Sequence, residues 1–275
     1  MIVVTGATGR FGSVVTNDVL GRRPADEIAV VARDPAKAAA LAERGVDVRP
    51  GDYDDPASLE KAFADADTLL FVSASDTTPG VRLRQHRAIV DAAAATGVGH
   101  VVYTSAITAE DGQSFLADHT TTERAIRDAG LTHTFLRNTF YTEELLVPET
   151  LATAVDSGEL TAPAIGHPLV TATIGDLAHA AATVLTGSGH ENAVYELRGP
   201  GWTYPELADT LSAVTGRPVR HREIADEEAG PMGFILPLLR HDQFGTATPD
   251  LELLLGRATT TLEQAVRATL DRRKP

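Results

Sequence analysis

Three glycines spaced three residues apart follow a short β-forming run at the start of the chain. Residues 2–12 read IVVTGATGRFG, and an amphipathic stretch follows over residues 13–20. This order predicts a strand, a tight turn and a helix that begins at a nucleotide-binding loop. Gly6 permits the turn, Gly9 lets the backbone approach a pyrophosphate, and Gly12 lets the helix lie close to the strand. The free N–H groups and the dipole of the helix would then face the phosphates.

The second expected strand, residues 27–32, ends at Arg33. Arg33 lies about twenty residues beyond the glycine loop, where NAD enzymes place an acid on the ribose and NADP enzymes tend to place an arginine. Arg33 therefore favours NADP(H), with Lys37 and Arg10 as possible helpers. Asp34 fits either the ribose acid of an NAD site or the N-cap of a helix that starts at Pro35. The Asp-Pro pair favours the cap.

Composition excludes several classes of function. The chain has 275 residues, a formal net charge of −14 and no cysteine. Its acidity argues against nucleic acid and anionic membranes as partners. Disulfides, thiolate metal sites and cysteine nucleophiles are absent, and the nine histidines show no HxxxH or HxH spacing, so no metal is expected. Without a basic leader or a long apolar run, we expect a soluble cytoplasmic protein.

Strands and helices alternate along the first half of the chain. Further strands are expected at residues 46–49, 68–72, 100–104 and 132–137, and helices at 58–64, 81–96 and 115–129. This alternation predicts an α/β fold with a doubly wound parallel sheet. Ligands of such sheets bind over the carboxyl ends of the strands. The residues that follow the strands are therefore the informative ones: Arg33, Asp52, Ser73, Ser75, Thr104, Ser105 and Asn138.

Beyond Tyr141, prolines and turns interrupt the pattern. A helix is still expected at 174–186, a strand at 193–197 and a helix capped by Thr203. We expect residues 1–140 to form the nucleotide-binding core, with 171–197 adding to it. Residues 141–170 and 198–275 would form a smaller substrate lobe. The apolar stretch 231–239 suits either an aromatic pocket or a subunit contact, so a homodimer is possible.

Several motifs together make the chain resemble the NmrA-like group of atypical short-chain dehydrogenases, in particular flavin-free bacterial NADPH:quinone oxidoreductases. They are VTGATG at 4–9, ARDPAKA at 32–38, GDYDD at 51–55, QH at 85–86, YTS at 103–105, LRN at 136–138 with Tyr141, and VYEL at 194–197. The resemblance implies a quinone or similar aromatic or enone acceptor beside the nicotinamide. It also implies bound NADP(H). The predicted cofactor residues are Gly6, Thr8, Gly9, Arg10, Phe11, Gly12, Arg33, Ser73, Ser75, Thr104, Ser105 and Asn138.

The Tyr-x-x-x-Lys pair of most short-chain dehydrogenases is missing. Ile107 stands four residues after Tyr103, Leu145 stands four after Tyr141, and no lysine occurs between positions 61 and 274. A lysine that lowers the pKa of a catalytic tyrosine is therefore unavailable. A quinone accepts hydride without such help, and the main task of the protein is then placement and exclusion of water.

Three side chains are candidate catalytic acids, and each has a structural alternative. Tyr103 either protonates a product or packs in the core. Tyr141 either flanks the nicotinamide or packs in a loop. His119 acts as an acid or an orienting group, or it is a cap or surface residue. Two other functions stay open: a reductase of enones or imines, and a regulator that senses NADP(H) without turnover.

Overall fold

The computed structural model describes residues 1–107 and 116–272, and the chain divides into two compact units. The first unit comprises residues 1–138 and 177–196, and the second comprises 139–176 and the chain from 197 onward. Each unit has its own hydrophobic cluster.

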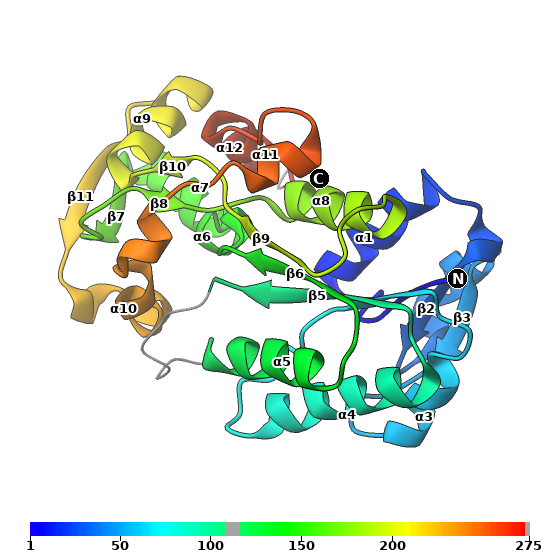
Figure 1. Cartoon of the computed structure of the whole chain (residues 1–275). Coiled ribbons are helices and arrows are strands. Elements are labelled where there is room, and N and C mark those ends of the chain that lie inside the picture. The colour runs from blue at the N-terminus through cyan, green and yellow to red at the C-terminus, as the bar shows by residue number, and fades with distance from the viewer. Residues whose placement is uncertain (108–115, 273–275) are drawn as a thin grey trace. The chain divides into compact units, whose positions relative to one another are not determined.

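The first unit contains a seven-stranded sheet in the order β3-β2-β1-β4-β5-β6-β9, of which the first six strands pair in parallel (Figure 1). The strands are β1 (Ile2–Val4), β2 (Ile28–Ala32), β3 (Asp47–Pro50), β4 (Thr68–Phe71), β5 (His100–Ala106), β6 (His133–Asn138) and β9 (Ala193–Leu197). The doubly wound fold is confirmed. The strand order reverses between β1 and β4, and this is the point where such sheets bind ligands.

Helices cover both faces of this sheet. α3, α4 and α5 lie on one face, and α1 and α8 lie on the other (Figure 1). The helices are α1 (Arg10–Leu20), α2 (Ala39–Ala42), α3 (Pro56–Ala62), α4 (Val81–Thr96), α5 (Ala117–Asp128) and α8 (Ile174–Thr186), with 3₁₀ turns at Ala25–Glu27 and Pro35–Ala38. The expected helix at 115–129 begins among the described residues at Ala117, and Phe115 lies outside them.

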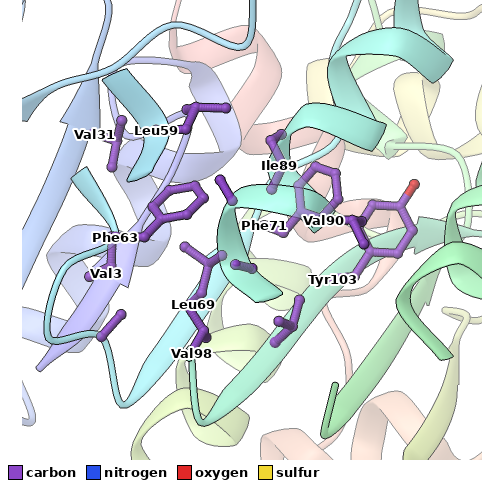
Figure 2. Close-up of a cluster of buried hydrophobic side chains, with 14 of the residues drawn as sticks. Val3, Val31, Leu59, Phe63, Leu69, Phe71, Ile89, Val90, Val98 and Tyr103 are labelled. Atoms are coloured by element: carbon purple, nitrogen blue, oxygen red, sulfur yellow. The ribbon is translucent and has the colours of Figure 1, made fainter. Parts of the chain in front are cut away.

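The core of the first unit lies between the sheet and the helices α3 and α4. Figure 2 shows Phe71 and Tyr103 from neighbouring strands against Ile89 and Val90 of α4, all of them buried. Burial of one large apolar side chain contributes about 1.5–3 kcal/mol. Because apolar residues fill both faces of the parallel strands, as for β2 with its five buried residues, these segments can be recognised as strands in the sequence.

The second unit is built from short elements. β7 (Glu159–Pro163) pairs in parallel with β11 (Arg220–Ile224), and β8 (Leu169–Val170) pairs antiparallel with β10 (Gly201–Trp202). Its helices are α6 (Thr142–Leu145), α7 (Pro148–Ser157), α9 (Tyr204–Thr215), α10 (Leu236–Leu239), α11 (Asp250–Leu255) and α12 (Leu262–Asp271), with 3₁₀ turns at Asp226–Glu228, Gly230–Phe234 and Asp242–Gly245. Thr203 caps α9 as expected: its Oγ1 accepts from the Glu206 amide, and Glu206 accepts from the Thr203 amide.

Among the described residues, no helix is long and apolar enough to cross a membrane.

Candidate functional site

Most of the predicted cofactor residues line one cavity of about 350 Å³ in the first unit. The cavity lies at the carboxyl ends of β1, β2 and β4, where the strand order reverses. The predicted residues along its wall are Gly6, Thr8, Gly9, Arg10, Phe11, Gly12, Arg33, Ser73 and Ser75. The remaining wall, which was not assigned from the sequence, consists of Val31, Ala32, Gly51, Tyr53, Val72, Ala74, Asp76 and Gln85.

The glycine loop is shaped by close backbone packing. Gly6 adopts a φ of +62°, in the left-handed region that favours glycine. A Cβ on Gly12 would lie 2.2 Å from the Gly6 carbonyl oxygen, and one on Gly9 would lie 3.3 Å from the same atom. Helix α1 begins with Gly9 as its N-cap, which has no side chain to occupy the first amides. The loop therefore leaves a concave surface of backbone N–H groups at a helix N-terminus, the geometry that binds phosphate.

Arg33 and Asp34 follow β2 and do different things. Asp34 Oδ1 accepts from the Ala36 amide at 3.1 Å and caps the short turn at Pro35–Ala38. The cap interpretation of Asp34 is therefore confirmed. Arg33 is exposed, lines the cavity and makes no hydrogen bond or ion pair with any described residue. Of the two side chains, the cation is the one that is available at the cavity.

Three successive amides of the loop after β4 donate to side chains from other elements. The Val72 amide donates to Thr5 Oγ1 at 2.9 Å, the Ser73 amide to Thr104 Oγ1 at 2.9 Å, and the Ala74 amide to a histidine of α4. These amides are consequently unavailable to a ligand, so Ser73 can contact a bound molecule only through its hydroxyl or carbonyl group. Thr104 thus shapes the cavity from behind.

Tyr53 closes the same region from the loop after β3. Its hydroxyl donates to the Val72 carbonyl at 2.8 Å and lies 2.7 Å from Thr5 Oγ1. Burial raises the pKa of Tyr53, so the phenol stays protonated. Tyr53 was missed as a site residue because its motif, GDYDD, carries no chemistry that identifies a hydrogen-bonding partner.

Two side chains of helix α4 bind the backbone amide and the backbone carbonyl of Ala74. His86 Nε2 accepts from the Ala74 amide at 2.9 Å, and Arg82 Nε donates to the Ala74 carbonyl at 3.0 Å. Because Nε2 accepts, the neutral ring carries its proton on Nδ1, which lies 2.8 Å from Thr122 Oγ1. Burial, with the charges of His119 and Arg82, lowers the pKa of His86 to about 3. His86 is therefore a neutral hydrogen-bonding residue at ordinary pH.

Two of the candidate catalytic acids lie behind this loop. The Tyr103 hydroxyl is 2.8 Å from His119 Nδ1, and both side chains are buried (Figure 2 shows Tyr103 beside Phe71). Burial raises the pKa of Tyr103 and lowers that of His119 to about 3. The expectation of a surface or cap position for His119 is wrong. Tyr103 occupies the core position weighed as its alternative, so the hydroxyl contacts protein groups, and a direct catalytic role for either residue stays a prediction.

Asn138 and Ser105 also stand off the cavity wall. Asn138 ends β6 with a side chain that is 6% exposed, and its Oδ1 has no hydrogen-bond partner among the described residues. Ser105 donates to Glu123 Oε1 at 2.7 Å. Glu123 also pairs with Arg137 at 2.7 Å, and that hydrogen bond raises the pKa of Arg137. Ser105 therefore belongs to a buried ionic network of α5 and β6, whereas Asn138 presents an unpaired acceptor.

The third candidate acid, Tyr141, belongs to the second unit. It is half-buried, forms an isolated bridge with Ala172 and precedes helix α6. Nearby, both carboxylate oxygens of Glu143 accept from the Ile174 amide at 3.1 Å. A proton-donating role for Tyr141 stays a prediction.

Across residues 1–107 and 116–272, no cluster of three or more histidine or acidic side chains could hold a metal ion. The site of the first unit is thus a glycine-lined cavity with an exposed arginine, of the kind that binds a phosphorylated nucleotide.

The sequence model of the NmrA-like family matches residues 1–238. The chain belongs to the NmrA-like family. It is 36% identical to Quinone oxidoreductase 2 of Escherichia coli K12 over 97% of each protein. Among solved structures, the Citrobacter triphenylmethane reductase complexed with NADP(H) superimposes with a TM-score of 0.89 and 36% identity, covering 98% of this chain and 100% of that one.

A second solved structure is the NADPH-dependent quinone oxidoreductase of Escherichia coli complexed with NADPH. It matches with a TM-score of 0.85 and 34% identity, over 98% of this chain and 99% of that one. The first of these two enzymes was crystallised with NADP(H) and the second with NADPH. The family resemblance expected from the motifs is confirmed, and it extends over nearly the whole chain.

Proposed function

We propose that this NmrA-like protein binds NADP(H) in the cavity of the first unit and transfers a hydride to a quinone-like acceptor without flavin. The main support for this proposal is that the glycine loop and the exposed Arg33 line the same cavity. The two NADP(H)-bound reductases, similar over almost the full chain, support the choice of cofactor and of reaction.

The described residues fit a phosphorylated dinucleotide on three counts. Gly9 and Gly12 leave a cradle that side chains would fill, and the α1 amides face it. Arg33 offers a 2′-phosphate a guanidinium that has no partner in the described part of the chain, whereas Asp34 is occupied as a cap. Asn138 offers a buried carboxamide oxygen that lacks a donor, which suits the amide of a nicotinamide.

When bound, NADPH supplies two electrons as a hydride. A quinone that takes this hydride and one proton becomes a hydroquinone, so no further oxidant or reductant is needed. Since the chain holds no lysine between positions 61 and 274, we assign the proton to water and not to a lysine-activated tyrosine. The contribution of the protein is placement: the amides of Val72, Ser73 and Ala74 are fixed from behind, so the cavity wall is preorganised.

The test is steady-state oxidation of NADPH and NADH by the purified protein with a simple quinone and no added flavin. We expect quinone-dependent turnover that is faster with NADPH. Arg33→Ala should raise the KM for NADPH roughly 10- to 100-fold, the worth of a charge-assisted contact, and leave NADH nearly unchanged. Arg124→Ala, which removes an exposed arginine of α5, is the matched control. An equal rise in the KM for NADPH and for NADH would show that Arg33 does not contact the 2′-phosphate.

A second acceptor class is favoured by the likeness to the triphenylmethane reductase. Triphenylmethane dyes are cations, and a protein with a net charge of −14 attracts cations. A panel of quinones, enones, imines and cationic dyes at one NADPH concentration would rank the acceptors. Tight NADPH binding without turnover across the panel would favour an NADP(H) sensor instead. The homodimer and the cytoplasmic location stay predictions, the first of them testable by light scattering.

A further inference from the structure

An acidic side chain stands beside the wall of the cavity that Arg33 lines. Asp54 follows Tyr53 in the loop after β3, and Tyr53 is part of that wall. Asp54 Oδ1 accepts from Arg84 Nη2 at 2.7 Å, and Asp54 Oδ2 accepts from Gln85 Nε2 at 3.0 Å. Both donors lie in the first turns of α4, and Gln85 itself lines the cavity. Both carboxylate oxygens therefore have partners on α4.

The charges of Arg33 and Asp54 attract each other. The hydrogen bonds from Arg84 and Gln85 are the main causes that lower the pKa of Asp54, and the charge of Arg33 adds to them. Asp54 is consequently ionised at neutral pH, and both its neighbour Tyr53 and its partner Gln85 line the cavity that Arg33 lines. An unpaired carboxylate at this place would repel a 2′-phosphate and would attract the Arg33 guanidinium to itself.

We propose that Arg84 strengthens the preference for NADPH over NADH, because its ion pair with Asp54 neutralises that carboxylate and leaves Arg33 available to a 2′-phosphate. This inference rests on the proposed NADP(H) site. Arg84 acts through Asp54 and need not touch the cofactor, so it is a positioning residue. The 2′-phosphate is the only part of NADPH that NADH lacks, so the effect of Arg84 should be confined to NADPH.

The exposure of the pair supports this interpretation over a purely structural one. The Arg84 side chain is 65% exposed and that of Asp54 is 46% exposed. Ion pairs so exposed contribute little to stability. A long-range electrostatic effect on a dianionic ligand, in contrast, requires only that the charge stand near the phosphate.

The experiment is direct measurement of the dissociation constants of NADPH and NADH by nucleotide fluorescence at low ionic strength. Three variants are compared with the wild type: Arg84→Ala, Asp54→Asn and the double variant. Arg84→Ala should weaken NADPH roughly three- to tenfold, with NADH changed less than about twofold. Asp54→Asn should leave NADPH binding unchanged or tighter. The double variant should recover NADPH binding to within about twofold of the wild type, because the carboxylate is gone.

Arg87→Ala is the matched control. Arg87 lies on the same helix, is also 65% exposed and pairs with Asp91, so its loss removes the same charge and a similar ion pair. NADPH binding should not change in this variant. Added salt should shrink the effect of Arg84→Ala, because screening weakens charges at the surface.

Two outcomes overturn the proposal. Equal weakening of NADPH and NADH binding by Arg84→Ala would show that the ion pair only holds the loop after β3 against α4. A double variant that binds NADPH as weakly as Arg84→Ala does would show the same. An Arg87→Ala variant that behaves like Arg84→Ala would show a nonspecific charge effect. Failure of the proposed function looks different, since the wild type itself would then bind neither nucleotide or would not prefer NADPH.

Discussion

Three buried polar side chains of the first unit hold one and the same loop, whereas buried polar side chains of the second unit fasten separate short segments to one another. In the first unit, Thr5, Thr104 and His86 each accept one amide of the loop after β4. In the second, Trp202 Nε1 donates to Thr171 at 2.8 Å, and Asp176 accepts from the Thr260 amide at 2.7 Å.

The difference follows from how each unit satisfies its backbone. In the seven-stranded sheet of the first unit, each inner strand pairs with a neighbour on both sides, so buried side chains are left to shape the loops at the strand ends. The second unit has two sheets of two strands each. Side chains there must complete the bonding of irregular segments. Substitutions in the first unit should therefore change the cavity as well as stability, and those in the second should change stability alone.

The largest effect is expected for Gly12→Ala. Its Cβ would lie 2.2 Å from the Gly6 carbonyl oxygen, so either the loop or α1 must shift. We expect a loss of about 2–4 kcal/mol in the free energy of unfolding and roughly 100-fold or more in NADPH affinity. In the second unit, Gly175 has no atom nearer than 3.9 Å to a Cβ, so Gly175→Ala should leave both unchanged. Urea unfolding measures the stability of the two variants, and nucleotide fluorescence measures their NADPH affinity.

The next effect tests the second unit by itself. The Asp176 carboxylate is 2% exposed and accepts from both Arg257 and the Thr260 amide at 2.7 Å. Asp176→Ala should lower the free energy of unfolding by about 2–3 kcal/mol, because the part-buried Thr260 amide and the Arg257 guanidinium both lose their acceptor. Arg257→Ala should lower it less, since that side chain is half exposed. NADPH affinity below the unfolding temperature should stay within about twofold of the wild type; a larger loss would break the division of roles between the units.

The pH dependence of stability sharpens the description of the first unit. His86 and His119 have pKa values of about 3 in the folded protein against about 6.5 when unfolded. The unfolded chain therefore binds more protons between these values, so stability is complete above pH 6.5 and falls as the pH drops from 6.5 toward 3. In His119→Gln, the slope of unfolding free energy against pH near pH 5 should fall by about one proton. A slope equal to that of the wild type would contradict the burial of His119.

The smallest effect concerns a helix cap of the second unit. Thr203→Ala removes the side chain that accepts from the Glu206 amide at the start of α9 and should cost about 1 kcal/mol. Thr210→Ala, at a half-buried position inside the same helix, should stay within about 0.5 kcal/mol of the wild type. Thermal unfolding of the two variants measures the difference, and equal values would show that the cap does not hold α9.

The sequence predicts the first unit far better than the second, and particular elements show why. The strand and helix bounds up to β6 follow from local patterns, namely buried apolar runs and helical periodicity between turns. The β7–β11 pair joins residues about 60 positions apart and has no local signature. The glycine loop and Arg33 are recognisable because their chemistry is local. The burial of His119 and the role of Tyr53 depend on neighbours that only the folded chain supplies.

The loop after β4 has its shape determined by residues outside it. Its amides at 72, 73 and 74 are held by Thr5, Thr104 and His86, and Arg82 holds the Ala74 carbonyl. The Ser75 side chain takes no part in those anchors, and the Ser73 hydroxyl meets one of them through a long contact of 3.5 Å from Thr104 Oγ1. The side chains at positions 73 and 75 can therefore be replaced while the backbone of the loop keeps its conformation. A library that randomises these two positions can alter what the cavity accepts while the course of the backbone is kept.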